Sequence, residues 1–205
     1  MVSDFSPRGV ESFSFFPTSV CVLTPSSKFL DYLDNHVDGL LQMFENSKKS
    51  SYETQSVVGG WRIENPHLRP ECKVLNLYLQ ASFAEIPLVR KLASQNTKFS
   101  LNSWLNVHES GGFNRIHHHG ASFLSGVVYL KVPPGSGNLR LKDPRPGRFF
   151  SQKFFDDSPS EMSLEPKKGM TVVFPGFLEH YVELSSYDSA SAEKRVSLAF
   201  NLLVA

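Results

Sequence analysis

The sequence predicts an α+β domain in which helices precede a sandwich or barrel of short antiparallel strands. Apolar residues recur at helical spacing before Phe99, whereas after it short apolar runs are separated by turns that contain Gly or Pro. The chain has 205 residues, which suits one domain and allows a buried core without disulfide or metal support. We therefore expect a single domain over residues 1–205, with a helical support region at 1–98 and a β-rich core at 99–205.

Two helices are predicted in the support region. The stretch Thr24-Pro25-Ser26-Ser27 offers a hydroxyl cap and an early proline, which are typical of a helix start. From Phe29 onward apolar residues recur at helical spacing, and the first helix is expected to end near Ser47 to Ser51. The pattern at 73–93 predicts a second helix with a break near Pro87, because proline lacks the backbone donor that a helix interior needs.

The rest of the support region is expected to be a strand and a loop. Residues 13–23 are rich in Phe and Val and predict a strand that is interrupted at Pro17. Residues 50–70 are polar and include Gly59-Gly60 and two prolines, so they predict mostly loop.

Short strands bounded by Gly or Pro are expected throughout the core. They span 99–107, 122–132, 138–141, 170–174, 180–184 and 195–204. Gly111-Gly112 predicts a turn soon after the first of these strands, and Pro175-Gly176 predicts another before the strand at 180–184. Residues 153–168 predict a polar insertion.

Charge and composition argue against several partners. The formal net charge is +1 and no basic stripe is present, so no nucleic-acid partner is expected. No run approaches 18 apolar residues, so we expect neither a transmembrane helix nor a membrane partner. Cys21 and Cys72 lack metal-site spacing and fit buried thiols in a reducing compartment, and the N-terminus has no signal-peptide pattern. A cytoplasmic protein is therefore expected, with a homodimer as the oligomer that base rates favour.

The most informative motif is a cluster of histidines. Of the seven in the chain, three are consecutive at 117–119, and His180 lies at the start of a predicted strand. In an extended strand residues two apart point to one face, so His117 and His119 should share a face and His118 should point away. Two imidazoles on one face and a third from another strand would form an open-sided site for a metal such as Fe(II). A lone histidine is more often a satisfied core or surface residue, so the prediction for His180 depends on the pair.

A second pattern lies on the last predicted strand. Arg195 and Ser197 share one face of a strand that is otherwise mainly apolar. If that face is internal, the guanidinium is a buried charge that needs a partner. A small dicarboxylate would supply one through a bidentate contact beside the serine hydroxyl. The alternative is that Arg195 faces solvent, as most arginines do.

Taken in order, these motifs resemble those of the Fe(II)/2-oxoglutarate-dependent oxygenases, in a bacterial and phage branch of the prolyl-hydroxylase-like superfamily. The superfamily order is His-x-(Asp/Glu), a distant His and then Arg-x-Ser, all on short strands. The matching strings are Ser103-Trp104-Leu105-Asn106, Asn114-x-x-His117-x-His119, Ser125-Gly126-Val127-Val128-Tyr129-Leu130, Asp143-Pro144-Arg145, Phe174-Pro175 with His180, and Arg195-x-Ser197-x-x-Phe200-Asn201. They cover residues 101–201, and the ordered set is more specific than any single string.

The resemblance implies a double-stranded β-helix, or jelly roll, as the catalytic core. It implies a dioxygenase that uses Fe(II), 2-oxoglutarate and O2 to hydroxylate a substrate and releases succinate and CO2. The implied iron ligands, which are also the catalytic residues, are His117, His119 and His180. Arg195 would hold the distal carboxylate of 2-oxoglutarate, with Ser197 and Tyr129 beside it, and Asn106 would line the pocket. No motif specifies the substrate, which we expect to be a small molecule or a peptide.

One departure from the superfamily pattern concerns the metal ligands. His119 stands where the usual triad has a carboxylate, and neither Glu109 nor Asp143 has the spacing to replace it. Iron with a 2-oxoglutarate dianion would then carry a net charge of about 0 rather than about −1. Three histidines also resemble the cupin-type thiol dioxygenases, which need no 2-oxoglutarate, so that activity is one alternative. A binding module without catalysis is the other. The Arg195-x-Ser197 pair favours the 2-oxoglutarate enzyme, because a thiol dioxygenase has no use for it.

Overall fold

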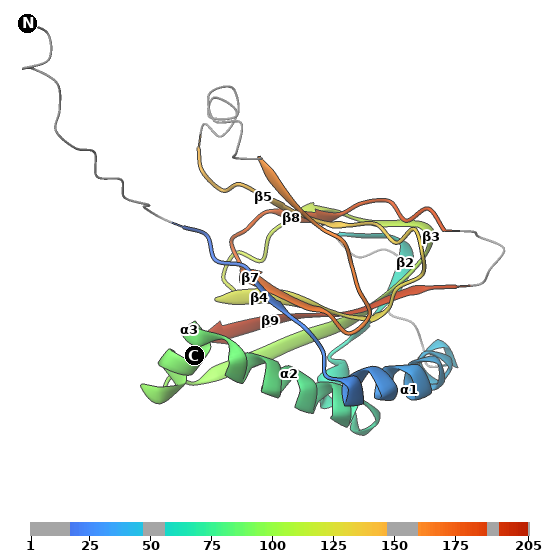
Figure 1. Cartoon of the computed structure of the whole chain (residues 1–205), viewed down its shortest axis with the longest axis horizontal. Helices are drawn as coiled ribbons and strands as arrows, with labels where there is room; N and C mark the ends of the chain where they lie inside the picture. The colour runs from blue at the N-terminus through green and yellow to red at the C-terminus, as the bar shows by residue number, and fades with distance from the viewer. Residues whose placement is uncertain (1–16, 47–55, 147–159, 188–192, 205) are drawn as a thin grey trace, which may run out of the picture.

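The computed structural model describes residues 17–46, 56–146, 160–187 and 193–204 (Figure 1). The helices in these ranges are α1 Ser27–Asn46, α2 Lys73–Glu85 and α3 Pro87–Ser94, with the short 3-10 helices η2 Pro66–Leu68 and η3 Pro70–Cys72 before α2. The strands are β1 Cys21–Leu23, β2 Val57–Glu64, β3 Phe99–His117, β4 Leu124–Lys131, β5 Leu139–Lys142, β6 Glu161–Leu164, β7 Thr171–Pro175, β8 His180–Val182 and β9 Arg195–Val204.

The described strands form one antiparallel sheet that curls on itself. The strand order is β1-β7-β4-β9-β3-β8-β5-β6, and β2 pairs with β3 off this path. Figure 1 shows β5 and β8 in the upper part of the curled sheet, β7, β4 and β9 in the lower part, and the helices in a layer beneath. The fold is a double-stranded β-helix with helices packed on one side, as the sequence resemblance implied.

Strand β9 shows why one sheet face packs on the helices and the other forms a site. From Arg195 to Leu202 its residues alternate between side chains that are polar or small and apolar side chains. The apolar set belongs to the core shared with α1, α2 and α3: Val196, Leu198, Phe200 and Leu202. The other set points into the curled sheet and lines an internal cavity: Arg195, Ser197 and Ala199. The same alternation on β3 places Leu105 and Val107 in the helix-side core.

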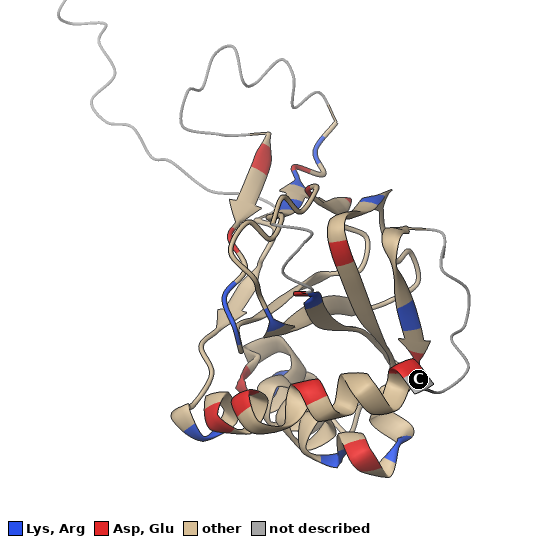
Figure 2. Ribbon diagram, turned by 90° about the vertical axis from the view of Figure 1, so that its right-hand side faces the viewer, with Lys and Arg blue, Asp and Glu red and all other residues tan. Residues whose placement is uncertain are grey.

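Helix α1 is held on the sheet mainly by its apolar face. That face is buried and recurs at helical spacing: Phe29, Leu33, Val37, Leu41 and Phe44. Three ion pairs link α1 to the β-rich core, joining Asp34 to Lys168, Asp38 to Lys131 and Glu45 to Lys194. These pairs are partly exposed, so each contributes about 0–1 kcal/mol and the apolar burial dominates. Figure 2 shows both signs of charge interspersed along the helices.

Two elements differ from their prediction. Residues 57–64, predicted as loop, form β2, and β3 runs on through the turn predicted at Gly111-Gly112. The glycines serve close backbone approach rather than a turn. A Cβ on Gly60 would lie 2.3 Å from the carbonyl oxygen of Val107, and one on Gly59 would lie 3.0 Å from the Cα of Gly112. The 1–98 support region is therefore not purely helical, because β1 and β2 belong to the sheet.

The other predicted elements agree with the structure to within a few residues, with one addition. The chain breaks between α2 and α3 at Pro87, as predicted, and β9 has the predicted bounds. Strand β1 lies within the predicted strand at 13–23, of which 13–16 are outside the described residues. Strand β6 is an addition, because it lies in the stretch predicted as a polar insertion. No helix in the described ranges is both long and apolar enough to span a membrane.

Gly126 in β4 gives a direct test of the close packing among β4, β7 and β9. A Cβ at this position would lie 2.5 Å from the Phe200 ring and 2.5 Å from the carbonyl oxygen of Val172. We expect Gly126→Ala to destabilise the protein by about 1–3 kcal/mol in urea denaturation, because backbone and ring must both shift. The matched control is Gly39→Ala on the exposed face of α1, where nothing lies within 4 Å of the new Cβ. It should stabilise the protein by about 0.5–1 kcal/mol. Equal effects of the two variants would contradict this packing account.

Candidate metal centre

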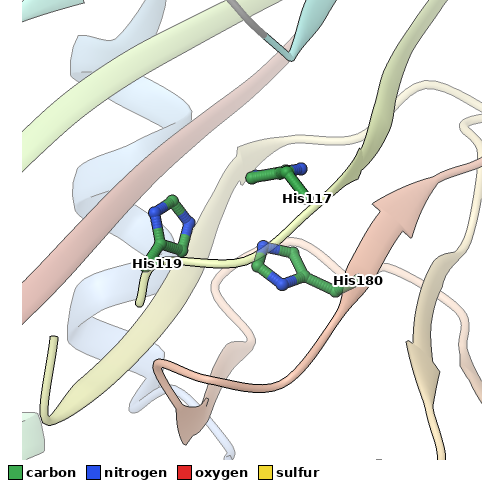
Figure 3. Close-up of side chains that lie close together, drawn as sticks. All are labelled: His117, His119 and His180. Carbon is green, nitrogen blue, oxygen red and sulfur yellow. The ribbon is translucent and has the colours of Figure 1, made fainter. Parts of the chain in front are cut away.

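Three histidines converge inside the curled sheet (Figure 3). His117 is the last residue of β3, His180 is the first residue of β8, and the two are directly paired in the strand register. His119 follows two residues after β3. One ring nitrogen from each histidine lies within 4.8 Å of the other two, which is the geometry of a metal-binding cluster. Among the described residues no carboxylate joins this cluster.

The loop that follows β3 brings His119 to the cluster, and this residue is not part of an extended strand. The expectation that both histidines share one strand face is therefore wrong in its premise, because β3 ends at His117. The backbone N–H of His119 donates to the carbonyl of Gly176 at 2.7 Å, and its own carbonyl accepts from the N–H of Ser122 at 2.7 Å. The Pro175-Gly176 turn thus positions His119 as well as His180. His118 lies outside the cluster, and its Nδ1 accepts from the N–H of Gly120 at 3.1 Å.

Backbone carbonyls select the metal-binding tautomer of two of the rings. The Nδ1 of His117 lies 2.7 Å from the carbonyl oxygen of Arg115, and the Nδ1 of His180 lies 2.8 Å from that of Leu178. A carbonyl can only accept, so each Nδ1 carries the proton and each Nε2 presents a lone pair. Metal-ligating histidines usually donate their other ring N–H to a carbonyl, a carboxylate or a water in this way, which fixes the orientation of the ring.

Burial keeps the three rings neutral at ordinary pH. Desolvation, with a smaller contribution from the His117 ring, lowers the pKa of His180 to about 3 and that of His119 to about 4. Desolvation also lowers the pKa of His117, against the opposing effect of its bond to the Arg115 carbonyl. Neutral imidazole is the form that coordinates a metal ion.

An internal cavity continues from the histidines toward Arg195. It is a narrow space of about 50 Å³ between the strands. Besides the three histidines, its polar lining comes from Asn114, Tyr129, Arg195 and Ser197. Arg195 is only 1 % exposed, so the solvent-facing alternative is wrong, and no carboxylate among the described residues pairs with it. Its guanidinium lies 5.3 Å from the centre of the Tyr129 ring.

Several buried polar atoms on this inner face have no hydrogen-bond partner among the described residues. They include Arg195 Nε and Asn106 Oδ1, whereas the Tyr129 hydroxyl interacts with the Arg195 guanidinium and the His108 ring with the backbone of Phe113. Buried polar atoms are nearly always satisfied, so such a cluster indicates a place for a ligand or ordered water. A carboxylate would accept from the guanidinium and from the tyrosine hydroxyl together. The residues present therefore fit the distal carboxylate of 2-oxoglutarate.

The strand register explains how these residues come together. Ser197 on β9 pairs with Asn106 on β3 and with Tyr129 on β4, so the three share the inner face. Asn106 is 5 % exposed but is not among the residues that line the cavity. Arg195 pairs with His108, and 3.5 Å separates Arg195 NH1 from His108 Nδ1. Since a guanidinium only donates, His108 accepts through Nδ1.

A second, more polar cavity opens on the other side of the histidines. It shares Trp104, His117 and His119 with the internal cavity, so the histidines separate the two spaces. The rest of its lining is Ser56, Arg62, Glu64, Asn65, Asn102, His118 and Asn201. Arg62 and Glu64 form an ion pair with 2.5 Å between Nε and Oε1, and the Arg62 guanidinium lies 4.4 Å from the centre of the Trp104 ring.

Sequence reasoning missed His108, Arg62 and Glu64 and gave Asn201 no role. The two-residue period from Trp104 through Asn106 to His108 was the available signal for His108. Arg62 and Glu64 lay in a stretch that predicted loop. Of the other polar residues in the matching motifs, Asp143 and Arg145 contact each other rather than the site. Asp143 and Arg145 form a two-point ion pair across the Pro144 turn.

A protein-family model described as "Putative 2OG-Fe(II) oxygenase" matches residues 102–201. This range holds β4 to β8, most of β3 and β9, and the histidines and Arg195 of the candidate site. Residues 102–201 thus match the family of 2-oxoglutarate/Fe(II) oxygenases. Members of this family use Fe(II), 2-oxoglutarate and O2, and the three-histidine cluster is the metal site that the described residues offer. No protein of curated function matches the chain in sequence.

Solved structures of other oxygenases share the fold. A prolyl-4-hydroxylase from Pseudomonas putida is 18% identical, with 91% of this chain and 92% of that chain covered and a TM-score of 0.62. The α-ketoglutarate-dependent epimerase SnoN of nogalamycin biosynthesis is 12% identical, covering 91% and 78%, with a TM-score of 0.65. HygX from Streptomyces hygroscopicus, solved with nickel and 2-oxoglutarate, is 12% identical, covering 90% and 82%, with a TM-score of 0.59.

We expect the stability of the metal-free protein to fall as the pH drops from about 6.5 to about 3. Burial, aided by the Arg195 charge, lowers the pKa of His108 from 6.5 to about 3. Within that window the unfolded chain binds more protons, so stability is present above pH 6.5 and is lost as the pH falls. Urea denaturation in EDTA across this window should show a shallower pH dependence for His108→Phe than for wild type. His36→Gln, at an exposed position on α1, is the control. An unchanged slope in His108→Phe would contradict the burial argument.

Proposed function

We propose that the protein is a 2-oxoglutarate- and Fe(II)-dependent dioxygenase that hydroxylates its substrate and releases succinate and CO2. The observation that carries this proposal is the pairing of a metal-binding histidine cluster with a buried guanidinium that has no carboxylate partner among the described residues, on one cavity wall. The family assignment and the shared fold support it.

Each site residue has a distinct part in this proposal. The Nε2 atoms of His117, His119 and His180 hold Fe(II), which supplies the oxidative chemistry when 2-oxoglutarate and O2 are bound. Arg195 binds the distal carboxylate of 2-oxoglutarate. Tyr129 and Ser197 donate hydroxyl hydrogen bonds beside it, and Asn106 supports this wall from the adjacent position on β3. Apolar residues such as Leu139, Phe174 and Val182 exclude water from the cavity.

Neutral ligands set the charge balance of the proposed centre. Three imidazoles add no charge, so the charges of Fe(II) and of a dianionic cosubstrate sum to about zero. The Arg195 cation then faces the far end of the dianion. An anionic cosubstrate is therefore favoured at both of its ends, and a carboxylate ligand in place of His119 would partly offset this.

The polar cavity is the proposed binding place of the substrate. It reaches His117 and His119 from the side opposite Arg195, and its one described cation–anion pair, Arg62 with Glu64, is already neutralised. Its remaining polar lining consists of amides, a serine hydroxyl and histidines. These groups match a neutral molecule with both donors and acceptors, such as a small polar metabolite or a peptide.

We further infer a cytoplasmic enzyme without a nucleic-acid or membrane partner, and a homodimer as its oligomeric state. The even charge balance, the free thiols of Cys21 and Cys72 and the interspersed surface charges support the first inference. The dimer rests on the general frequency of such assemblies.

Arg195 provides the first functional test. We expect Arg195→Met to raise the dissociation constant of 2-oxoglutarate by about two to three and a half orders of magnitude, because the carboxylate loses a buried charged partner worth about 3–5 kcal/mol. Methionine keeps most of the buried volume, and Fe(II) affinity should change little because Arg195 is not a metal ligand. A tenfold or smaller change in 2-oxoglutarate affinity would contradict this role.

Turnover separates the proposed activity from the alternatives. We expect purified protein with Fe(II) and ascorbate, which supplies the two electrons that reduce the second oxygen atom to water when no substrate is present, to convert 2-oxoglutarate slowly to succinate and CO2 under air, and His180→Ala to abolish this conversion. Oxygen uptake that requires a thiol and ignores 2-oxoglutarate would instead identify a thiol dioxygenase. Absence of both reactions, together with a thermal midpoint unchanged by metal and 2-oxoglutarate, would identify a non-catalytic binding module.

A further inference from the structure

The third ligand of the cluster is held differently from the other two. His117 and His180 each donate Nδ1–H to a backbone carbonyl, which is a fixed acceptor. The Nδ1 of His119 instead faces the side-chain amide of Asn201 on β9, with 3.4 Å between Nδ1 and Nδ2. His119 also lies outside the regular strand, as Figure 3 shows, so its ring depends more on side-chain contacts than the other two rings do.

The Asn201 amide is itself anchored inside the sheet. The hydroxyl of Ser125 on β4 lies 2.7 Å from Asn201 Oδ1, and the two residues are direct partners in the β4–β9 register. Ser125 is 1 % exposed. Ser125, Asn201 and His119 therefore form a hydrogen-bonded chain that links the middle of the sheet to the metal cluster.

The chemistry of the amide decides which tautomer of His119 this chain selects. When Nδ2 faces the ring, the amide donates, Nδ1 must be unprotonated, and Nε2 carries the proton. A protonated Nε2 cannot coordinate a metal ion. Rotating the amide by 180° exchanges Oδ1 and Nδ2 without moving the side chain. Oδ1 then accepts from His119 Nδ1–H, Nδ2 donates to the Ser125 hydroxyl, and Nε2 is free.

We propose that Asn201 is a positioning residue that holds His119 in its metal-binding tautomer, with Ser125 fixing the amide from behind. In the metal-bound state Asn201 Oδ1 accepts from His119 Nδ1–H. Each of the three histidines then donates its Nδ1–H to an oxygen acceptor. The inference rests on the proposed function, because it takes the histidine cluster to be a metal site. Asn201 thus accepts the Nδ1–H of His119, as backbone carbonyls do for His117 and His180.

The test measures metal affinity and ring protonation in place of turnover. Ni(II) binding is measured by isothermal titration calorimetry in wild type, Asn201→Leu, Asn201→Asp and Asn102→Leu. We expect Asn201→Leu to weaken Ni(II) binding by about 10–100-fold, which is the usual loss when a residue hydrogen-bonded to a metal ligand is removed. Asn102 is the matched control, because it is the register partner of Asn201 and lines the same cavity but has no bond to the cluster. Its leucine variant should bind Ni(II) within about threefold of wild type.

The aspartate variant decides the direction of the hydrogen bond. A carboxylate only accepts, so Asn201→Asp can take hydrogen bonds from both His119 and Ser125 and should bind Ni(II) at least as tightly as wild type. In the Zn(II)-loaded wild type, nitrogen-15 NMR should show a protonated Nδ1 on His119. This resonance should move in both Asn201 variants and stay unchanged in Asn102→Leu.

Each outcome bears on the inference. Wild-type affinity in Asn201→Leu, or a clear loss in Asn201→Asp with Zn(II)-bound His119 unprotonated at Nδ1, would overturn it while leaving the proposed function intact. A wild type that binds neither Ni(II) nor Fe(II) would overturn the proposed function and this inference together. If Asn201→Leu fails to fold, the sign of the Asn201→Asp effect and the wild-type NMR spectrum still decide the question.

Discussion

The inner face of the sheet is organised around one buried charge, the guanidinium of Arg195. It lies at 1 % exposure beside the Tyr129 ring and His108, with no carboxylate partner among the described residues. Burying a cation without a counter-ion is costly, and desolvation accordingly lowers its pKa. A rigid surrounding sheet can hold the buried cation in place, and an anion that binds beside it in the proposed working state would offset the desolvation cost. The guanidinium also helps to keep His108 neutral, so that the neighbouring ring accepts a hydrogen bond rather than repelling the cation.

The pairing of β9 with β3 and β4 converts this constraint into a site. The helix-side residues of β9 pack into the main core and fix the strand, which leaves its alternate residues facing inward. The register then places Ser197 between Asn106 and Tyr129. At the other end of the cavity, the register pair of His117 with His180 brings two ring nitrogens together on neutral side chains. A dianion that reaches from the histidine cluster toward Arg195 would meet positive charge at each end once a metal is bound.

Short-range patterns in the sequence predicted much of this structure. Helical periodicity and the proline break define α1, α2 and α3, and strict alternation defines β9. The histidine motif and Arg195-x-Ser197 identify the residues that the fold collects around one cavity. What the sequence could not predict depends on contacts between distant segments. Strand β2 forms because paired glycines let its backbone approach β3 closely, and glycines in isolation indicate a turn.

The placement of His119 has the same origin. Two-residue spacing suggested one strand face, whereas the contact of its backbone with Gly176, far along the chain, actually turns the residue toward the cluster. His108 and Asn201 became recognisable only through their cross-strand partners. A buried polar residue on a strand is ambiguous in sequence, because the neighbour that gives it a role lies on another strand.

In the proposed centre, three neutral histidines hold Fe(II) and leave room for 2-oxoglutarate to chelate it on the side of Arg195. The most direct test is an anaerobic titration of the metal-free protein with Fe(II) and then 2-oxoglutarate, followed by visible absorption. We expect a metal-to-ligand charge-transfer band in wild type that is lost in His119→Ala. Iron binding without this band, or no iron binding at all, would contradict this proposal.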